Sequence, residues 1–297
     1  MVCMIDGKSY RLIKNAIQSN ADRTAYFELA KKIFGLDFSI WYRSGFCGDS
    51  FIPYTLYDND AAIASVGVAV GEFQWQNSTI QYCQISTVMT DSFYRGRGLS
   101  RWLMELVLAE WTEKSDFIYL YANDSVLDFY PRFGFVKRHE YLYSIPICKK
   151  AGAYRNLDLH NPNDMALLTE KCKFCNNPFS ALSMMNNFSH LMFHCVTFLY
   201  NDIFYVDEYD AVVIAEYRDD VLFCHDIFTT TQCNMADILA VFARETPTTV
   251  KLGFTPRMTG HCKCEELIEP NTTLFTLKTK RDIWSGHNIT FPFLARA

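Results

Sequence analysis

The chain has 297 residues, of which 49% are hydrophobic and 21% are charged. That length is enough for one large domain or two ordinary ones, and the composition is that of a folded globular protein. The net charge of −5 at pH 7 argues against nucleic acid or an anionic membrane as the main partner, because both attract basic surfaces.

The sequence predicts a cytoplasmic protein. Residues 1–10 contain Asp6 and Lys8 and no apolar run, so they do not resemble a secretory signal. The 11 cysteines are scattered along a long chain, whereas secreted disulfide frameworks are short and dense, and we expect reduced thiols. The longest stretch without Asp, Glu, Lys or Arg, 174–201, is interrupted by Pro178 and two histidines, which argues against a membrane span.

The first half shows strand and helix patterns in close succession. The predicted elements are a helix at 15–34, strands at 52–57, 61–75 and 79–90, a helix at 98–113, a strand at 117–122, a short helix at 125–133 and a strand at 135–145. Gly35 and Gly134 are expected to end the first and third of these helices. This order predicts an α/β (α+β) fold in which helices flank a mixed, twisted sheet.

The chain turns polar around 151–163, and we place the domain boundary there, giving domains at 1–150 and 151–297. The elements predicted for the second half are helical patches at 165–171 and 180–195, strands at 211–217 and 221–229, a helix at 235–244, and strands at 248–254 and 274–279. Two strands, a helix and a strand repeat the order of the first half. The second domain is therefore expected to be a degenerate copy of the first, or a domain that shapes the substrate pocket or provides an interface.

The chemically informative stretch is 86–100, where a strand ends, two glycines and two arginines follow, and a helix begins. Glycine lets a backbone turn tightly and approach a ligand closely. The free amide groups at a helix start carry partial positive charge and bind phosphate, and arginines can add charged contacts. A plain surface turn would give a similar pattern. The glycine spacing excludes both a mononucleotide P-loop and a dinucleotide-binding fingerprint.

The run Arg95-x-x-Gly98-x-Ser100 resembles the pyrophosphate-binding signature of GNAT acetyltransferases, although Ser100 stands where the family usually has Gly or Ala. Asn123 and the run 129–135, Phe-Tyr-Pro-Arg-Phe-Gly-Phe, resemble the second family motif. The order of elements from residue 10 to residue 145 also fits. The resemblance implies an acetyl-coenzyme A-dependent N-acetyltransferase.

The resemblance also implies roles for individual residues. The third strand would splay from its neighbour, so that the backbone of Val88 to Thr90 pairs with the pantetheine arm as an added strand would. Tyr130 would be the general acid that protonates the departing thiolate, although a core aromatic is the ordinary role for a tyrosine in such a motif. The implied cofactor-binding residues are Val88, Met89, Thr90, Arg95, Gly96, Arg97, Gly98, Leu99, Ser100, Asn123 and Ser125.

The general base is not apparent, because the strand at 79–90 contains no Asp or Glu. Glu72 and Asp91 are candidates, but each has the pattern of a solvated charge. The chain is also similar to two-domain acetyltransferases of the enhanced-intracellular-survival type, whose C-terminal carboxylate reaches the active site. That similarity implies the same role for the carboxylate of Ala297, at the end of an apolar tail.

The second half offers weaker signals. The loop that would correspond to the phosphate loop, 229–234, has neither glycine nor arginine, so it should bind no cofactor. Cys172 and Cys175 and the run His261-Cys262-x-Cys264 offer zinc-type ligands, but their spacing is unlike a zinc ribbon, and we expect no metal site. His190 and His194 lie one helical turn apart and are expected to be core or interface residues.

The leading functional hypothesis is acetyl transfer to a primary amine, carried on a small molecule or a peptide, by direct attack on acetyl-coenzyme A. The alternative is a non-catalytic acyl-coenzyme A-binding or partner-binding module. A third hypothesis replaces acetyl with a longer acyl group. The sequence leaves open the acceptor amine and whether the protein forms a homo-oligomer, because one fold serves many functions.

Overall fold

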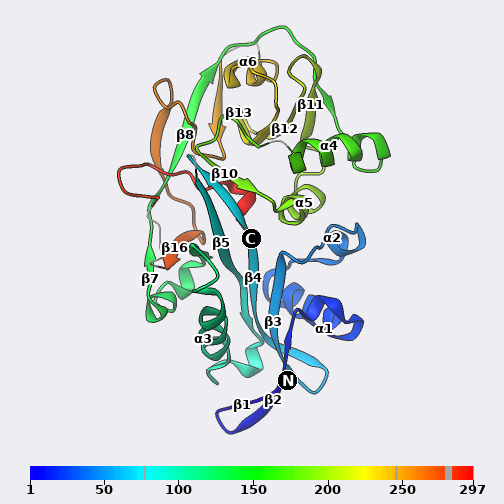
Figure 1. The fold of residues 1–297 in the computed structure, drawn as a ribbon, viewed down its shortest axis with the longest axis vertical. Helices are drawn as coiled ribbons and strands as arrows, with labels where there is room; N and C mark the ends of the chain where they lie inside the picture. Colours follow the sequence, from blue (N-terminus) through cyan, green and yellow to red (C-terminus); the bar gives the residue numbers. More distant parts are fainter. Residues whose placement is uncertain (77, 175, 245–246, 278–282, 297) are drawn as a thin grey trace.

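The computed structural model describes residues 1–76, 78–174, 176–244, 247–277 and 283–296. Two sheets follow one another along the axis of an elongated molecule, with the N-terminus at one end and the end of the chain between the sheets (Figure 1). Six α-helices among the described residues pack on the sheets: α1 (Asn20–Phe34), α2 (Ser39–Arg43), α3 (Leu99–Trp111), α4 (Pro162–Phe174), α5 (Phe188–Thr197) and α6 (Met235–Ala240). The prediction of mixed, twisted sheets flanked by helices is confirmed.

The first sheet has nine strands and mixed direction. In spatial order they are β1 (Val2–Ile5), β2 (Lys8–Lys14), β3 (Phe51–Asp58), β4 (Ala61–Trp75), β5 (Ser78–Thr90), β6 (Phe117–Ala122), β16 (Thr273–Leu277) and β7 (Phe135–Lys137), with β10 (Leu182–Met185) paired to β4. α1 and α3 cover opposite faces of this sheet (Figure 1). Each face therefore has its own apolar cluster, one under α3 and one under α1 and α2.

The second sheet has seven strands in the described part of the chain. In spatial order they are β15 (Lys263–Leu267), β8 (Glu140–Ile147), β14 (Thr248–Leu252), β13 (Val221–Phe228), β12 (Ala211–Arg218), β11 (Ile203–Val206) and β9 (Arg155–Asn156). The α6 side chains pack with β12, β13 and β14 in a third apolar cluster. No described helix combines the length and the apolarity that a membrane span needs.

Three predicted elements are wrong in detail. The strand predicted at 135–145 is two strands in different sheets, because the first ends at Lys137 and the chain crosses to the other sheet before Glu140. The helix predicted at 180–195 begins only at Phe188, since residues 182–185 pair with the end of β4. The short helix at 125–133 is two 3-10 turns, at Asp124–Val126 and Tyr130–Phe133, and Pro131 prevents a continuous α-helical hydrogen-bond ladder.

The central unit of the first sheet recurs in the second. β4 and β5 pair antiparallel and β5 and β6 pair parallel, with α3 between them in sequence. β12 and β13 likewise pair antiparallel, β13 and β14 pair parallel, and α6 lies between them in sequence. The pairing of β4 with β5 shifts register at Ser65/Gly67, and that of β12 with β13 shifts at Ile214/Ala215; in each pair the extra residue lies on the second strand. This repetition supports the expectation that the second half is a copy of the first.

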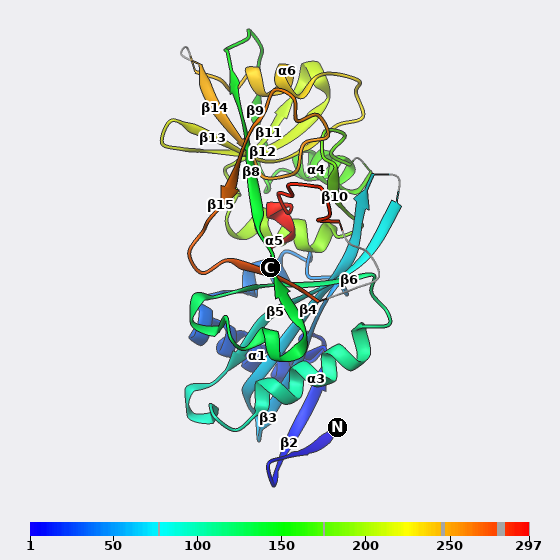
Figure 2. The same ribbon diagram turned by 90° about the vertical axis from the view of Figure 1, so that its left-hand side faces the viewer.

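Strands from both sides of the expected boundary between residues 150 and 151 are mixed in the two sheets. The domain boundary itself stays a prediction. β8 precedes the boundary but lies in the second sheet, whereas β10 and β16 follow it and lie in the first. The chain therefore crosses between the sheets several times (Figure 2). The final segment, residues 289–295, is almost entirely buried between the two sheets.

Candidate active site

The end of β5 separates from β6. The parallel pairing runs from Tyr82 opposite Phe117 to Ile85 opposite Leu120, and there it stops. Beyond that point β6 pairs with β16 on its other side, whereas residues 86–90 of β5 pair only with β4 among the described strands. The edge of β5 that faced β6 is therefore left with backbone groups that an extended ligand could pair with.

A bulge at the start of this open segment turns the strand. Thr87 has a φ of 42°, which a β-branched residue rarely adopts. A side chain at Gly67, opposite the bulge on β4, would place its Cβ 2.4 Å from Thr87 Oγ1, so this position needs glycine. The Tyr26 hydroxyl of α1 also contacts Thr87 Oγ1, at 3.3 Å. The bulge is thus held from two sides.

The predicted phosphate loop lies at the end of the open strand. Gly96 and Gly98 have φ values of 76° and 71°, and their Cβ positions face open space. α3 starts directly at Leu99 with no side-chain cap, so the amide groups of its first turn have no helical acceptor. The side chains of Arg95 and Arg97 are exposed beside them. The loop thus offers both amide donors and charge to an anion.

Two contacts fix the loop to the strand and to α1. The hydroxyls of Thr90 and Ser100 lie 2.6 Å apart, which ties the last residue of β5 to the first turn of α3. Ser100, which departs from the usual small residue here, is therefore accommodated by a hydrogen bond. Lys32 of α1 donates to Asp91 at 2.7 Å and lowers the pKa of its carboxyl. An ion-paired, acidic carboxylate is a poor candidate for a general base.

Tyr130 lies in the apolar cluster under α3, which also contains Leu99, Leu103 and Phe275. Its side chain is 6% exposed, and burial raises its pKa to about 12. The phenol is therefore protonated at neutral pH and has a proton to give. Asn123 follows the last residue of β6, and both Asn123 and Ser125 are exposed at the same end of the sheet.

A small pocket adjoins the open segment on the opposite face, under α1 and α2. Its walls are mainly apolar and aromatic, and its polar groups come from three serine or threonine residues and one histidine. The lining residues are Leu36, Phe38, Trp41, Ser50, Phe51, Ala69, Ser86, Thr87, His190 and Phe193. Ser86 and Thr87 directly precede Val88, so the pocket reaches the strand segment expected to hold the cofactor.

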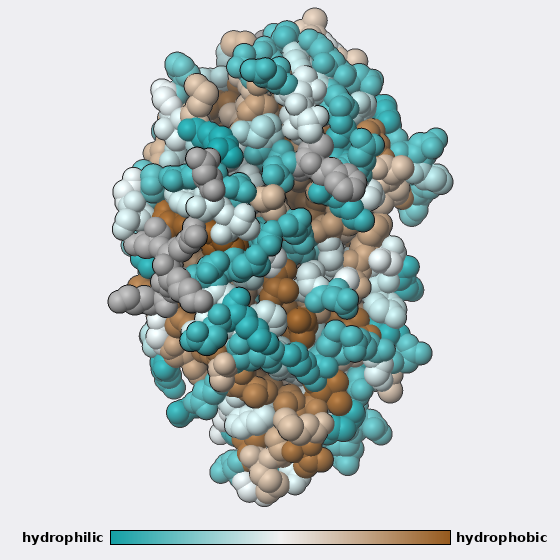
Figure 3. All heavy atoms as spheres, in the orientation of Figure 1, coloured by the Kyte–Doolittle hydropathy of each residue, from teal (hydrophilic) through white to brown (hydrophobic). Residues whose placement is uncertain are grey.

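Successive side chains of β5 point to opposite faces of the sheet, so the Tyr130 side of the site and the pocket under α1 and α2 lie on different faces. Val88 packs toward the cluster of Leu99 and Tyr130, whereas Met89 belongs to the cluster of Phe38 and Phe51. A ligand that lies in the gap beside β5 can therefore be reached from both faces. Figure 3 shows hydrophobic side chains at the surface at mid-height of the molecule, among hydrophilic ones.

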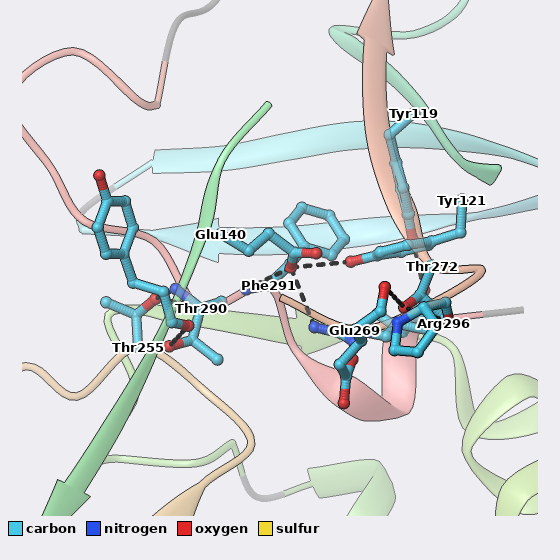
Figure 4. Close-up of polar contacts among 12 residues, drawn as sticks. Tyr119, Tyr121, Glu140, Thr255, Glu269, Thr272, Thr290, Phe291 and Arg296 are labelled. Atoms are coloured by element: carbon cyan, nitrogen blue, oxygen red, sulfur yellow. Dashed lines mark hydrogen bonds and ion pairs between the residues drawn. The ribbon is translucent and has the colours of Figure 1, made fainter. Parts of the chain in front are cut away.

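The C-terminal tail is anchored beside this pocket. The Arg296 guanidinium is buried and donates to Glu140 at 3.0 Å and to Glu269 at 2.8 Å (Figure 4). Burial raises the pKa of Glu140, opposed by Arg296 and by the Tyr121 hydroxyl, which donates to the same carboxylate. The Ala297 carboxylate itself, expected to reach the site, lies outside the described residues.

Neither the pocket nor the place of its histidine was apparent from the sequence. Trp41, Phe193 and His190 come from α2 and α5, which are separated by about half of the chain and contact each other only in the fold. The pair His190 and His194 was apparent as a helical repeat; His190 is buried and His194 half-buried, with their rings stacked at 5.4 Å. Only the tertiary structure places one of the two at a pocket.

The other candidates from the sequence do not assemble into a second site. Glu72 accepts hydrogen bonds from Gln81 and Asn186 and does not line the pocket described above. Within the described part of the chain, no three His, Cys, Asp or Glu side chains are grouped to hold a metal ion, and Cys175 lies outside that part.

Residues 21–135 match the model of the acetyltransferase (GNAT) family. No curated protein matches the chain. Among solved structures, a protein of Enterococcus faecalis V583 described as a probable N-acyltransferase has a TM-score of 0.56 at 13% identity, covering 91% of this chain and 72% of its own.

Two further structures have a similar fold over nearly the whole chain. Eis1 from Mycobacterium abscessus has a TM-score of 0.55 at 14% identity, with 89% of this chain and 73% of that chain covered. A GCN5-related N-acetyltransferase from Kribbella flavida has a TM-score of 0.53 at 16% identity, with 90% and 71% covered. At such identities the similarity establishes a shared fold, and it extends through both sheets.

Proposed function

Because residues 21–135 match the model of the acetyltransferase (GNAT) family, we propose that the protein transfers an acetyl group from acetyl-coenzyme A to a primary amine. The family resemblance inferred from the motifs at 95–100 and 129–135 is thereby confirmed. The observation that carries the proposal is the open edge of β5 at residues 86–90, which leads directly into a glycine-rich helix start. The family match supports acyl transfer in general. That the donor is acetyl-coenzyme A and the acceptor a primary amine is our proposal.

The residues present fit the proposed co-substrate. The amides of 96–100 and the side chains of Arg95 and Arg97 would hold the pyrophosphate, since they combine free donors, a helix N-terminus and positive charge. The backbone of Val88 to Thr90 would pair with the pantetheine arm. Asn123 and Ser125, exposed past the end of β6, would lie beside the thiol end. When bound, acetyl-coenzyme A supplies an activated acetyl thioester.

Tyr130 would act as the general acid. The amine nitrogen attacks the thioester carbonyl carbon, the carbon–sulfur bond breaks, and the Tyr130 hydroxyl gives its proton to the departing sulfur. Burial keeps this phenol protonated until the sulfur becomes basic. The proton that the amine loses passes to a base. The Ala297 carboxylate is our candidate for that base, and the buried anchoring of Arg296 in the preceding position supports it.

A thermal-shift titration with acetyl-coenzyme A tests the proposal. Ligand at about 100 times its dissociation constant adds about 2.7 kcal/mol of stability, which should raise the melting temperature of a chain this long by about 5 °C. We expect the double variant R95E/R97E to lose the shift, because both side chains are exposed at the loop. Arg257→Glu makes the same kind of charge change at an exposed site in the second half and should keep it.

Tyr130→Phe separates catalysis from binding. It should keep the full thermal shift and lose amine-dependent thiol release by about 100-fold or more. A wild-type protein that shows no shift would disprove the proposed function and favour a partner-binding module. A shift that is retained in R95E/R97E would place the cofactor elsewhere. Full turnover in Tyr130→Phe would remove the tyrosine from the mechanism.

A further inference from the structure

The polar groups of the pocket under α1 and α2 are incompletely satisfied. Ser86 Oγ and His190 Nε2 are buried, and neither has a hydrogen-bond partner among the described residues. Both side chains are 5% exposed, and both line the pocket. Buried polar atoms in proteins are nearly always paired, so two orphan atoms at one pocket indicate that a ligand or a water completes them.

The His190 ring lies near the end of the chain. Burial lowers the pKa of its imidazole, and the backbone of Arg296 partly opposes that effect. The ring is therefore neutral at neutral pH and carries one N–H and one lone pair. Nε2 has no partner among the described residues, so in the tautomer with the proton on Nδ1 its lone pair faces the pocket unpaired. A neutral imidazole in this form is a hydrogen-bond acceptor.

The rest of the described pocket wall is uncharged. Its large side chains are Leu36, Phe38, Trp41, Phe51 and Phe193, and none of the described Asp, Glu, Lys or Arg residues lines it. Such a wall disfavours an acceptor with several charges, because each charge would lose its hydration without a partner. It favours an amine attached to an apolar or aromatic group.

We propose that this pocket binds the acceptor substrate, a primary amine on an apolar group, and that His190 Nε2 accepts a hydrogen bond from its N–H. The inference rests on the proposed function and adds to it a substrate class and a binding residue from the second half of the chain. The hydrogen bond holds the amine nitrogen beside Ser86 and Thr87, next to the open edge of β5. The nitrogen lone pair is thereby directed toward the thioester.

This role is one of positioning and not of proton uptake. Burial lowers the pKa of His190 to about 4, and that of its stacked neighbour His194 to about 3. An efficient general base has a pKa near the working pH, which is well above these values. A side chain that keeps an acceptor atom at the same place should therefore replace His190, even if it cannot be protonated.

Three variants test this role. His190→Asn keeps a polar group near the Nδ1 position but removes the acceptor at Nε2. His190→Gln places an amide oxygen close to Nε2. His194→Asn is the matched control, because His194 lies one turn along α5, is half-buried and does not line the pocket. Each variant is assayed with 2-phenylethylamine and with spermidine, and its acetyl-coenzyme A thermal shift is measured.

We expect the wild type to prefer 2-phenylethylamine, and His190→Asn to lower kcat/KM for it by about 10- to 100-fold, mainly through KM. His190→Gln and His194→Asn should stay within about fivefold of the wild type. All three variants should keep the thermal shift. Equal losses in His190→Asn and His194→Asn, or no rescue by His190→Gln, would overturn the role of His190.

The two proposals fail in different ways. A wild type that shows the thermal shift but prefers spermidine, or acetylates neither amine, would overturn the substrate class and leave the cofactor site standing. A wild type with no thermal shift would overturn the proposed function, and the acceptor inference with it.

Discussion

At the residue scale, Asp226 on β13 is a carboxyl group buried in the second sheet. Burial raises its pKa to about 7, although it accepts hydrogen bonds from Asn177 Nδ2 at 2.6 Å and from the Ile227 amide at 2.9 Å. The unfolded chain has an ordinary aspartate pKa near 3.9. Between about pH 4 and pH 7 the native state therefore binds more protons than the unfolded state.

That difference gives a pH dependence of stability with a definite sign. The free energy of unfolding falls as the pH rises from about 4 to 7, and the whole loss is present above pH 7. Asp226→Asn cannot ionise, and its amide oxygen can still accept from Asn177. We expect the variant to be more stable than the wild type by about 1–3 kcal/mol at pH 8, and by much less at pH 5.

Urea denaturation at both pH values measures this effect. Asp128→Asn is the control, because Asp128 is exposed and its change should add nothing at either pH. An advantage of Asp226→Asn that is the same at pH 5 and pH 8 would contradict the raised pKa.

At the element scale, the C-terminal tail behaves as a core element although it has little regular structure. Residues 289–292 hydrogen-bond to β8 and to the segment after β14, through Tyr141 and Thr255. Phe291 is fully buried and packs against Phe73 of β4, edge to face at 5.1 Å, and against Tyr119 of β6 at 4.5 Å. The tail therefore joins both sheets.

Phe291→Ala should destabilise the protein by about 3–5 kcal/mol, since it leaves a cavity among aromatic rings. Phe93→Ala is the matched control: Phe93 is 80% exposed, and its loss should cost less than about 0.5 kcal/mol. Chemical denaturation of both variants gives the comparison. A loss below 1 kcal/mol for Phe291→Ala would mean that the tail is held by its polar contacts alone.

At the scale of the whole molecule, the exchange of strands makes the first half dependent on the second. β16 pairs with β6 over five residues and with β7 over three, so it completes the sheet between them. β10 extends the pairing of β4 in the same way. A fragment that ends at residue 150 would expose unpaired strand edges on β4, β6 and β7 and the apolar surface beneath them.

We therefore expect residues 1–150, expressed alone, to aggregate or to melt without cooperativity, and to show no thermal shift with acetyl-coenzyme A. Co-expression with residues 151–297 should restore a soluble complex. Size-exclusion chromatography and circular dichroism report both results. A monomeric 1–150 fragment that melts cooperatively would show that the first half is an independent domain, in agreement with the boundary expected from composition.

The sequence alone determined the local elements at the centre of the first sheet. The expected strands at 61–75 and 117–122 coincide with β4 and β6, and the helix ends at Gly35 and Gly134 have the left-handed backbone expected of glycine. These features depend on alternation, periodicity and glycine's conformational freedom, which act between near neighbours. The glycine-rich loop and the family motifs can likewise be identified from residues that are close together in sequence.

Only the tertiary structure decided which strands and helices are neighbours. The chain leaves the first sheet near Arg138. Residues 182–185 pair with β4, and β16 inserts next to β6, so segments far apart in sequence become neighbours. An apolar run of a few residues is compatible with several partners, and global packing selects among them. The pocket also depends on global packing, because His190 and Trp41 become neighbours only when α5 packs on α2.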